Sequence, residues 1–295
     1  MPQKPYRIAH LSDLHLTACD DASRSEPKIF RKLKGMNAAF RSLVRTPDLA
    51  SCDLILVTGD VTDCGESGAW KVFWDALRSR GLADRLVVLP GNHDLCCLGL
   101  RPLRPDKDYA KADLEKAAEG LKMGGQRTKF PWVAVPDPRV AVFCLNSCNL
   151  GNLTAMTNAI GQLGYYQLLT FADQLHKYRD VPVKIVALHH SPNIPKAETA
   201  RKCGQAGVSV LTRLTMQIPA PQRRALRLLC VTHRVRMIVH GHMHLKEDRE
   251  VNSVRIVGAP ATTEPAKSRG RQYHFWIYTV TASNRVLHQL RTVTL

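Results

Sequence analysis

The feature that most constrains the fold of this 295-residue chain is a recurring pair: a short apolar run followed by a side chain that can bind a metal ion. Short runs rich in Val, Ile and Leu are typical of buried strands. Five such runs are followed by candidate ligands, namely Asp13, His15, Asp60, Asn92, His189, His242 and His244. Open α/β sheets bind ligands outside the carboxyl ends of their strands. The five runs therefore predict one composite site at a sheet edge.

Two pairs of candidate ligands, Asp13/His15 and His242/His244, have a single residue between their members. In an extended segment, alternate residues point to the same side of the chain. We therefore expect each pair to bind one ion from one side. Three neighbouring histidines would then face the opposite side, and we interpret them as structural: His10, His190 and His240.

Carboxylate, amide and imidazole groups suit hard to borderline divalent metals. The same set accepts manganese, iron or zinc, so the sequence predicts metal ions without selecting one. Each motif alone has a simpler interpretation; for example, Asn92 beside Gly91 could be a turn residue. The joint occurrence of the motifs in one chain favours the metal site.

The order D-x-H, G-D, G-N-H-D, H and G-H-x-H resembles the calcineurin-like metallophosphoesterase family. The motifs stand at Asp13–His15, Gly59–Asp60, Gly91–Asp94, His189 and Gly241–His244. Together they span most of the chain. The stretches Thr58–Glu66 and Leu89–Asp94 also resemble the cyclic-nucleotide phosphodiesterase branch of that family.

The resemblance implies a centre of two metal ions. It assigns the first ion to Asp13, His15 and His244. Asp60 would bridge the two ions. The second ion would be completed by Asn92, His189 and His242. In the similar branch the first histidine of such a pair is the ligand, and His190 stays the alternative to His189.

The resemblance also implies hydrolysis of a phosphodiester, of nucleotide type, by a metal-bound hydroxide. Two metal ions can clamp a phosphoryl group and stabilise both the attacking and the leaving oxygen. Asp60 would take part by bridging the cations and lowering their repulsion. His93 would protonate the leaving oxygen or hold the phosphate, because imidazole titrates near neutral pH. We hypothesise that Asp94 orients a neighbouring imidazole.

Three other reactions stay open. A nuclease of the double-strand-break repair type shares the G-N-H-D and G-H-x-H motifs. A phosphomonoesterase or protein phosphatase would use the same metals. Soluble enzymes that hydrolyse a nucleotide-sugar lipid pyrophosphate resemble this chain but carry Arg where His93 stands, although relatives with His perform that reaction. An inactive scaffold is disfavoured because every expected ligand is present.

The formal net charge of +17 predicts anionic partners. Positive charge attracts anionic substrates and raises encounter rates. We expect an anionic phosphate ester as the substrate. Nucleic acid, whose binding salt would weaken steeply, stays an alternative, as does a plain basic surface.

The sequence shows neither of the two apolar segments that would direct a chain to or across a membrane. No apolar run approaches the roughly 20 residues of a membrane span. The first residues, Met1–Pro5, lead directly into a strand and lack the apolar region of a signal peptide. The nine cysteines include no C-x-x-C pair, which suggests reduced thiols rather than a metal framework. We therefore expect a cytoplasmic protein without a membrane span.

Helices alternate with strands before residue 244. Apolar residues at three- and four-residue steps predict helices over residues 28–45, 67–80, 162–177 and 221–233. Strands alone follow, over residues 254–257, 273–280 and 286–293. This order predicts a mixed α/β layered domain. The family resemblance implies two packed mixed β-sheets flanked by helices, an α/β/β/α sandwich.

We predict a single domain, residues 1–295, because the candidate ligands run from near the start to residue 244. Two polar, basic segments are additional to the strands and helices of a minimal core, at about residues 95–131 and 192–221. Both follow strands that end in candidate ligands. Inserted loops there would form the walls or the lid of the site, and we expect them to determine substrate choice.

Overall fold

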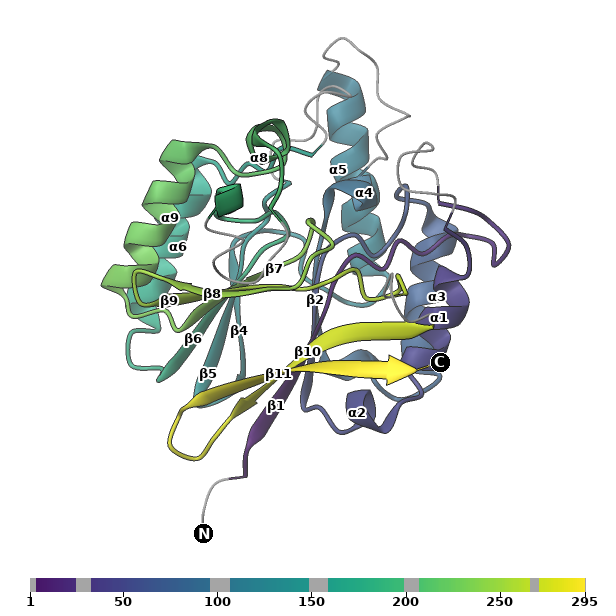
Figure 1. Ribbon diagram of the computed structural model, residues 1–295, viewed down its shortest axis with the longest axis horizontal. Helices are drawn as coiled ribbons and strands as arrows, with labels where there is room; N and C mark the ends of the chain where they lie inside the picture. Colours follow the sequence, from purple (N-terminus) through teal and green to yellow (C-terminus); the bar gives the residue numbers. More distant parts are fainter. Residues whose placement is uncertain are drawn as a thin grey trace.

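A computed structural model describes residues 4–24, 33–95, 107–148, 159–198, 207–265 and 271–294. Within these residues two mixed β-sheets pack against each other, and helices cover the outer face of each sheet (Figure 1). The predicted fold class, an α/β/β/α sandwich of two mixed sheets, is confirmed.

The first sheet has five strands in the order β11-β10-β1-β2-β3. Their bounds are β1 Tyr6–Leu11, β2 Leu54–Thr58, β3 Leu86–Leu89, β10 Gln272–Val280 and β11 Val286–Thr294. Strands β1, β2 and β3 are parallel. Strand β10 pairs antiparallel with both β1 and β11, so the end of the chain returns to lie beside its beginning.

The second sheet has six strands in the order β4-β5-β6-β7-β9-β8. Their bounds are β4 Trp132–Asp137, β5 Val140–Cys144, β6 Val183–Ala187, β7 Met237–His240, β8 Glu247–Val251 and β9 Val254–Gly258. The four central strands are parallel, and the two edge strands are antiparallel. Three of the central strands, β5, β6 and β7, are buried throughout, as expected for parallel strands covered on both faces.

Helices fill the two outer layers. Their bounds are α1 Met36–Leu43, α2 Pro47–Ala50, α3 Ser67–Arg78, α4 Asn92–Leu95, α5 Lys107–Lys122, α6 Tyr165–Lys177, α8 Val210–Thr215 and α9 Ala220–Thr232, with a 3₁₀ turn, η2, at Ala83–Arg85. Helices α1 and α3 cover the first sheet, and α6 and α9 cover the second (Figure 1).

The contact between the sheets is an apolar core to which both contribute. Ile8 and Leu56 from the first sheet and Val142 and Ile185 from the second are fully buried in it. Close packing of this kind leaves little freedom for one layer to move against the other. The core therefore fixes how the strand ends of the two sheets face each other.

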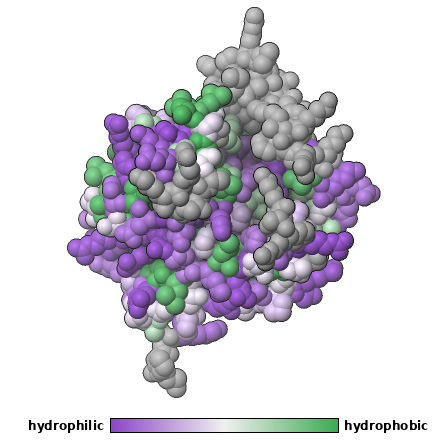
Figure 2. Space-filling model, in the orientation of Figure 1, coloured by the Kyte–Doolittle hydropathy of each residue, from purple (hydrophilic) through white to green (hydrophobic). Residues whose placement is uncertain are grey.

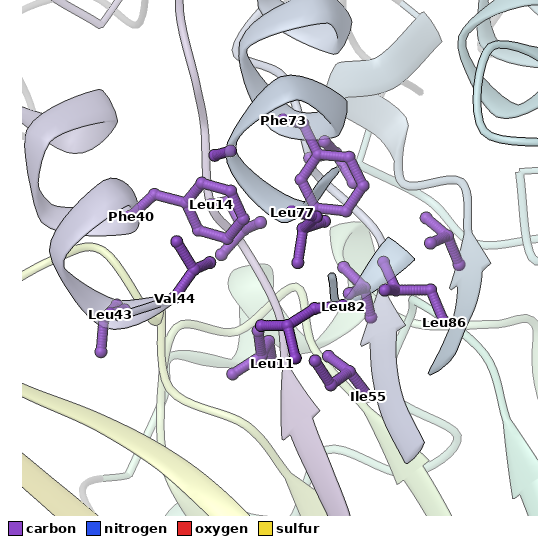
Figure 3. Close-up of a cluster of buried hydrophobic side chains, with 14 of the residues drawn as sticks. Leu11, Leu14, Phe40, Leu43, Val44, Ile55, Phe73, Leu77, Leu82 and Leu86 are labelled. Carbon is purple, nitrogen blue, oxygen red and sulfur yellow. The ribbon is translucent and has the colours of Figure 1, made fainter. Parts of the chain in front are cut away.

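A second core joins α1 and α3 to the first sheet. Figure 3 shows Phe40 of α1 and Phe73 of α3 above Leu11 of β1 and Ile55 of β2. The two phenylalanine rings stack with their centroids 5.4 Å apart. Burial of each such side chain contributes about 1.5–3 kcal/mol, so this cluster anchors the strands that lead to the site.

The predicted elements agree with the structure apart from one helix start. Helices α3, α6 and α9 and strands β9, β10 and β11 lie within three residues of the predicted bounds. The helix predicted over residues 28–45 begins only at Met36. Gly35 precedes it with φ +84°, a left-handed conformation that a helix cannot contain. Residues 28–32 lie outside the described residues.

The inserted segment 95–131 was expected to be a loop, but part of it is helical. It contains α5, which packs on α3. The Trp74 indole nitrogen donates to the Gly120 carbonyl over 2.8 Å, and a Cβ on Gly124 would lie 2.2 Å from the same ring. Residues 96–106 lie outside the described residues. The segment 192–221 includes α8 and the first two residues of α9, and residues 199–206 lie outside the described residues.

Hydrophilic side chains cover most of the described surface on the face that Figure 2 shows. Among the described residues, no helix combines the length and the apolar character that crossing a membrane requires.

Candidate metal centre

All seven candidate ligands follow the carboxyl ends of strands, as predicted. Those of the first sheet follow β1, β2 and β3 and are Asp13, His15, Asp60 and Asn92. Those of the second sheet follow β6 and β7 and are His189, His242 and His244. All but His244 are at most 5% exposed. The two sheets therefore bring their ligands to one shared edge.

The spacing of the ligand pairs predicted an extended backbone at this edge, and that expectation was wrong. Asp13 and His15 have φ of 54° and 46°, and His242 and His244 have φ of 69° and 52°. Asp60 is also left-handed, with φ of 51°. Non-glycine residues rarely adopt this region, and such strain concentrates at functional sites. The members of each pair converge because the chain turns tightly, not because a strand alternates.

Glycines let the turns approach each other. Gly59 has φ +99°, and a Cβ there would lie 2.5 Å from the His189 Nδ1 atom and 2.8 Å from the Gly91 Cα atom. A Cβ on Gly241 would lie 1.8 Å from the Ser12 hydroxyl oxygen. Side chains at these positions would push the strand ends of the two sheets apart.

The first ligand cluster is Asp13, His15 and His244. The Nε2 atoms of His15 and His244 lie 3.1 Å apart, and His244 Nε2 lies 3.4 Å from Asp13 Oδ1. Carboxylate and imidazole atoms of all three residues lie within 4.8 Å of one another. This spacing leaves room for one ion bound by all three.

The second ligand cluster is Asp60, Asn92, His189 and His242. His189 Nε2 lies 3.1 Å from Asn92 Oδ1 and 3.3 Å from Asp60 Oδ2. The His242 ring lies beside the His189 ring, and their centroids are 5.1 Å apart. Asp60 Oδ2 also lies 3.9 Å from His15 Nε2. The Asp60 carboxylate thus stands between the two clusters.

Hydrogen bonds fix which nitrogen of two imidazoles faces the centre. His189 Nδ1 lies 2.7 Å from the Thr58 carbonyl oxygen, and His93 Nδ1 lies 2.8 Å from the Asp63 carbonyl oxygen. A carbonyl oxygen only accepts, so each Nδ1 carries the hydrogen. The Nε2 atom of each ring is left for a ligand.

The carboxylates draw positive charge into the clusters. Burial opposes charge on His244, but the carboxylates of Asp13 and Glu264 together outweigh it and raise the pKa of His244 to about 10. Burial also opposes charge on His189, but Asp60, Asp13 and the Thr58 carbonyl together outweigh it and raise the pKa of His189 to about 9. Burial, followed by the neighbouring His189, lowers the pKa of His242 to about 3. The site therefore favours cations beside Asp13 and Asp60, whether protons or metal ions.

The residues fit a pair of metal ions. His242 Nε2 is buried and has no hydrogen-bond partner among the described residues. The Nε2 atoms of His15 and His244 face each other at 3.1 Å, a separation at which either a proton or a metal ion can lie between the two rings. Oxygen and nitrogen ligands in these numbers suit divalent manganese, iron or zinc.

The histidines interpreted as structural have partners of their own. His10 lies 2.7 Å from the Tyr278 hydroxyl and 2.9 Å from the Thr58 hydroxyl. His240 lies 3.1 Å from the Glu247 carboxylate. His190 Nδ1 lies 2.8 Å from the Ser147 hydroxyl. His189, not His190, approaches Asp60, which favours the first histidine of the pair as the ligand.

His93 and Asp94 differ in how they meet expectation. His93 lies beside the centre, its ring centroid 4.6 Å from that of His15, and it could also join His15 and Asp60 around one ion. The hypothesis that Asp94 orients an imidazole was wrong. Its carboxylate accepts from the backbone of Val61, Thr62 and Gly91 and from the Thr62 hydroxyl. Burial, together with the Asp60 charge, raises the pKa of Asp94 to about 6.

Three charged residues near the centre were not predicted: Arg24, Asp63 and Glu264. Glu264 lies 3.1 Å from the Nδ1 atom of His244. It stands 20 residues beyond that histidine in the chain, where no motif or spacing marked it.

Comparison with known proteins places this geometry in a family. A family model for calcineurin-like phosphoesterases matches residues 6–246. A 3',5'-cyclic-nucleotide phosphodiesterase of Nostoc sp. is 22% identical over 271 residues, which cover 91% of this chain and 83% of that protein.

Solved structures share the fold at low identity. A dimetal phosphatase from Danio rerio superposes with a TM-score of 0.64 and 12% identity and covers 98% of both chains. The phosphopantetheinyl hydrolase of Mycobacterium tuberculosis superposes with a TM-score of 0.55 and 13% identity, covering 97% of this chain and 95% of that one. With the family model spanning most of the sequence, the chain belongs to the calcineurin-like phosphoesterases and is a hydrolase.

Proposed function

We propose that this hydrolase is a binuclear metal-dependent phosphodiesterase that acts on a nucleotide-type substrate. The observation that carries the proposal is the position of Asp60 between two ligand clusters, each of which combines residues from both sheets. The diester preference is supported by the stretch around Gly59 and Asp60, which resembles the cyclic-nucleotide branch, and by the name of the Nostoc relative.

In this proposal two ions, manganese, iron or zinc, are held by the clusters. The first cluster holds one ion, the second cluster the other, and Asp60 contributes to both. When bound, such ions neutralise the phosphate charge and lower the pKa of a coordinated water, which makes a nucleophile available near neutral pH.

The protein's own groups would orient and protonate the substrate. Because His93 Nδ1 is committed to the Asp63 carbonyl, its Nε2 atom is the one that can give a proton to the leaving oxygen. The His93 backbone N–H donates to Asp60 Oδ1 over 2.8 Å. This bond ties the position of the acid to the carboxylate between the clusters. Burial of the site limits water and strengthens the attraction between its charges and an anionic substrate.

Two chromogenic substrates test the reaction class. With manganese added, bis-p-nitrophenyl phosphate should be hydrolysed faster than p-nitrophenyl phosphate, and Asp60→Ala should lose both metal and activity. Faster hydrolysis of the monoester would assign the protein to the phosphomonoesterases. Inertness of the metal-loaded protein toward every phosphate ester would refute the proposal.

A wider panel tests the substrate. Cyclic nucleotides, dinucleotides, nucleic acids and nucleotide-sugars should be compared at equal concentration with manganese. We expect cyclic nucleotides or dinucleotides to give the highest kcat/KM. Preference for a nucleotide-sugar would instead support the pyrophosphatase alternative.

The net charge of +17 favours one second candidate, a nuclease. A protein that contacts several phosphates loses affinity steeply as salt rises. Retention on single- or double-stranded DNA that falls with salt, together with cleavage of that DNA, would support the nuclease. Retention without cleavage would assign the charge to the surface alone.

A further inference from the structure

A buried arginine lies behind the first ligand cluster. The Arg24 side chain is 2% exposed, and its Nη1 atom lies 2.5 Å from the Glu264 carboxylate. Its Nε atom lies 3.6 Å from Asp63 Oδ1. The three residues come from separate loops, between β1 and α1, after β2, and after β9. A buried charge is costly unless paired, so this arrangement holds the three loops together.

Each of the two carboxylates also faces the outer nitrogen of an imidazole in the first cluster. Glu264 Oε1 lies 3.1 Å from His244 Nδ1, within hydrogen-bond distance. Asp63 Oδ1 lies 4.0 Å from His15 Nδ1, too far for a hydrogen bond but close enough for electrostatic attraction. The inner Nε2 atoms of the same two rings face each other at 3.1 Å.

We propose that Arg24, Glu264 and Asp63 form a positioning network for the first metal ion. Glu264 accepts the Nδ1 proton of His244 and so keeps the Nε2 lone pair directed at the ion. Asp63 favours the same orientation of His15, and Arg24 holds both carboxylates in place. Outer carboxylates of this kind fix the tautomer of a ligating imidazole and raise its basicity. The inference rests on the proposed binuclear function.

The network should act on one ion and not on the other. In the second cluster, His189 Nδ1 is bound by the Thr58 backbone carbonyl, which no side-chain substitution removes. Neither Arg24 nor Glu264 is an ion-pair partner of a residue of that cluster in the described part of the chain. Removing the network should therefore weaken binding of the first ion and leave the affinity for the second ion unchanged.

The experiment measures metal binding instead of turnover. The full chain, stripped with a chelator, is titrated with Co²⁺, and bound cobalt is followed by visible absorption and by elemental analysis after dialysis. Wild type should bind two ions. Glu264→Ala should keep one ion at wild-type affinity and bind the other roughly 10–100-fold more weakly. Glu264→Gln, which retains a carbonyl that can accept the Nδ1 proton, should recover part of that loss.

Asp248 provides a matched control. Its carboxylate joins Arg255 at 3.2 Å and His288 at 2.7 Å, the same combination of partners that Glu264 has. The two acidic side chains are similarly exposed, at 31% for Asp248 and 26% for Glu264. Asp248→Asn should leave both cobalt affinities at their wild-type values.

Arg24→Met extends the test to the whole network. If the arginine acts through Glu264, the losses in cobalt affinity of Arg24→Met and Glu264→Ala should be less than additive in the double variant. Should Arg24→Met fail to fold, the comparison of Glu264→Ala with Glu264→Gln decides alone.

Three outcomes would overturn the inference. Wild-type affinity for both ions in Glu264→Ala would remove the positioning role. Equal weakening of both ions would show a general structural effect. A wild-type protein that binds fewer than two ions would refute the proposed function itself, and this outcome is visible before any variant is made.

Discussion

The backbone amide of His242 lies 3.0 Å from each carboxylate oxygen of Asp13. This bond crosses from the second sheet to the first at the candidate centre. Asp13 therefore has two separable tasks, to hold the sheets together and to bind an ion.

Two substitutions of Asp13 should separate these tasks. Asp13→Asn keeps an acceptor for the His242 amide, so it should lose the first ion and, in the metal-free protein, only the stability that the charge of Asp13 gives by pairing with His244. Asp13→Ala leaves a buried N–H unpaired and should cost an additional 1–3 kcal/mol or so. Denaturant unfolding in EDTA, together with metal analysis, checks both. Equal stability of the two variants would contradict the structural task.

His93→Ala tests the proposed acid. The variant should retain both ions, because the two ligand clusters are complete without it, and kcat should fall by roughly 10²–10⁴-fold. Metal analysis and steady-state kinetics on bis-p-nitrophenyl phosphate measure the two effects. Loss of an ion would instead make His93 a ligand, which its place near His15 and Asp60 also allows.

Gly59→Ala tests the close approach of the strand ends. The new methyl group would lie 2.5 Å from His189 Nδ1, so the variant should lose stability and metal content. Gly81→Ala is the control, because Gly81 also has positive φ (+64°) but nothing in the described part of the chain approaches its Cβ position within 4 Å. Backbone strain alone costs about 1–2 kcal/mol, and crowding should add about 1–3 kcal/mol. Equal melting temperatures and metal contents would refute the crowding.

Acid sensitivity should depend on His10. Burial, followed by the neighbouring His240, lowers the pKa of His10 to about 3, against about 6.5 in an unfolded chain. Between these values the unfolded chain binds a proton that the folded protein excludes. Stability should therefore fall as the pH falls, by up to about 1.4 kcal/mol per pH unit from this residue.

The slope of stability against pH isolates that contribution. Unfolding of metal-free protein should be measured from pH 7 to pH 4 in wild type and in His10→Gln. The variant starts less stable, because it loses hydrogen bonds to Tyr278 and Thr58, but its stability should decline less steeply. Identical slopes would mean that His10 titrates normally.

Strand ends were the predictable part of this protein. Apolar runs such as Leu54–Thr58 indicate buried strands, and the rule for α/β sheets places the residues after them at one edge. The left-handed turns at Asp13 and His242 could not be predicted from spacing, because a separation of two residues fits either an extended or a turned chain.

Contacts between distant loops were beyond the sequence. Arg24 and Glu264 are 240 residues apart, and neither belongs to a periodic pattern or a motif. Asp94 belongs to a motif, yet three of the four hydrogen bonds described for it come from backbone amides, which carry no sequence signal. Helix α5 was missed because its first residues read as a charged, polar segment, although Gly120 lies against Trp74.

The pairing of β1 with β10 sets a lower limit on how far this enzyme can be shortened. The last motif ends at His244, but β1, which leads to Asp13, depends on β10 for its outer hydrogen bonds and on Tyr278 for the partner of His10. A fragment cut after the motifs would expose an open strand edge, and such edges recruit other chains. We expect that truncated form to aggregate. The strands after His244 are therefore required for an active protein, although they contribute none of the candidate ligands.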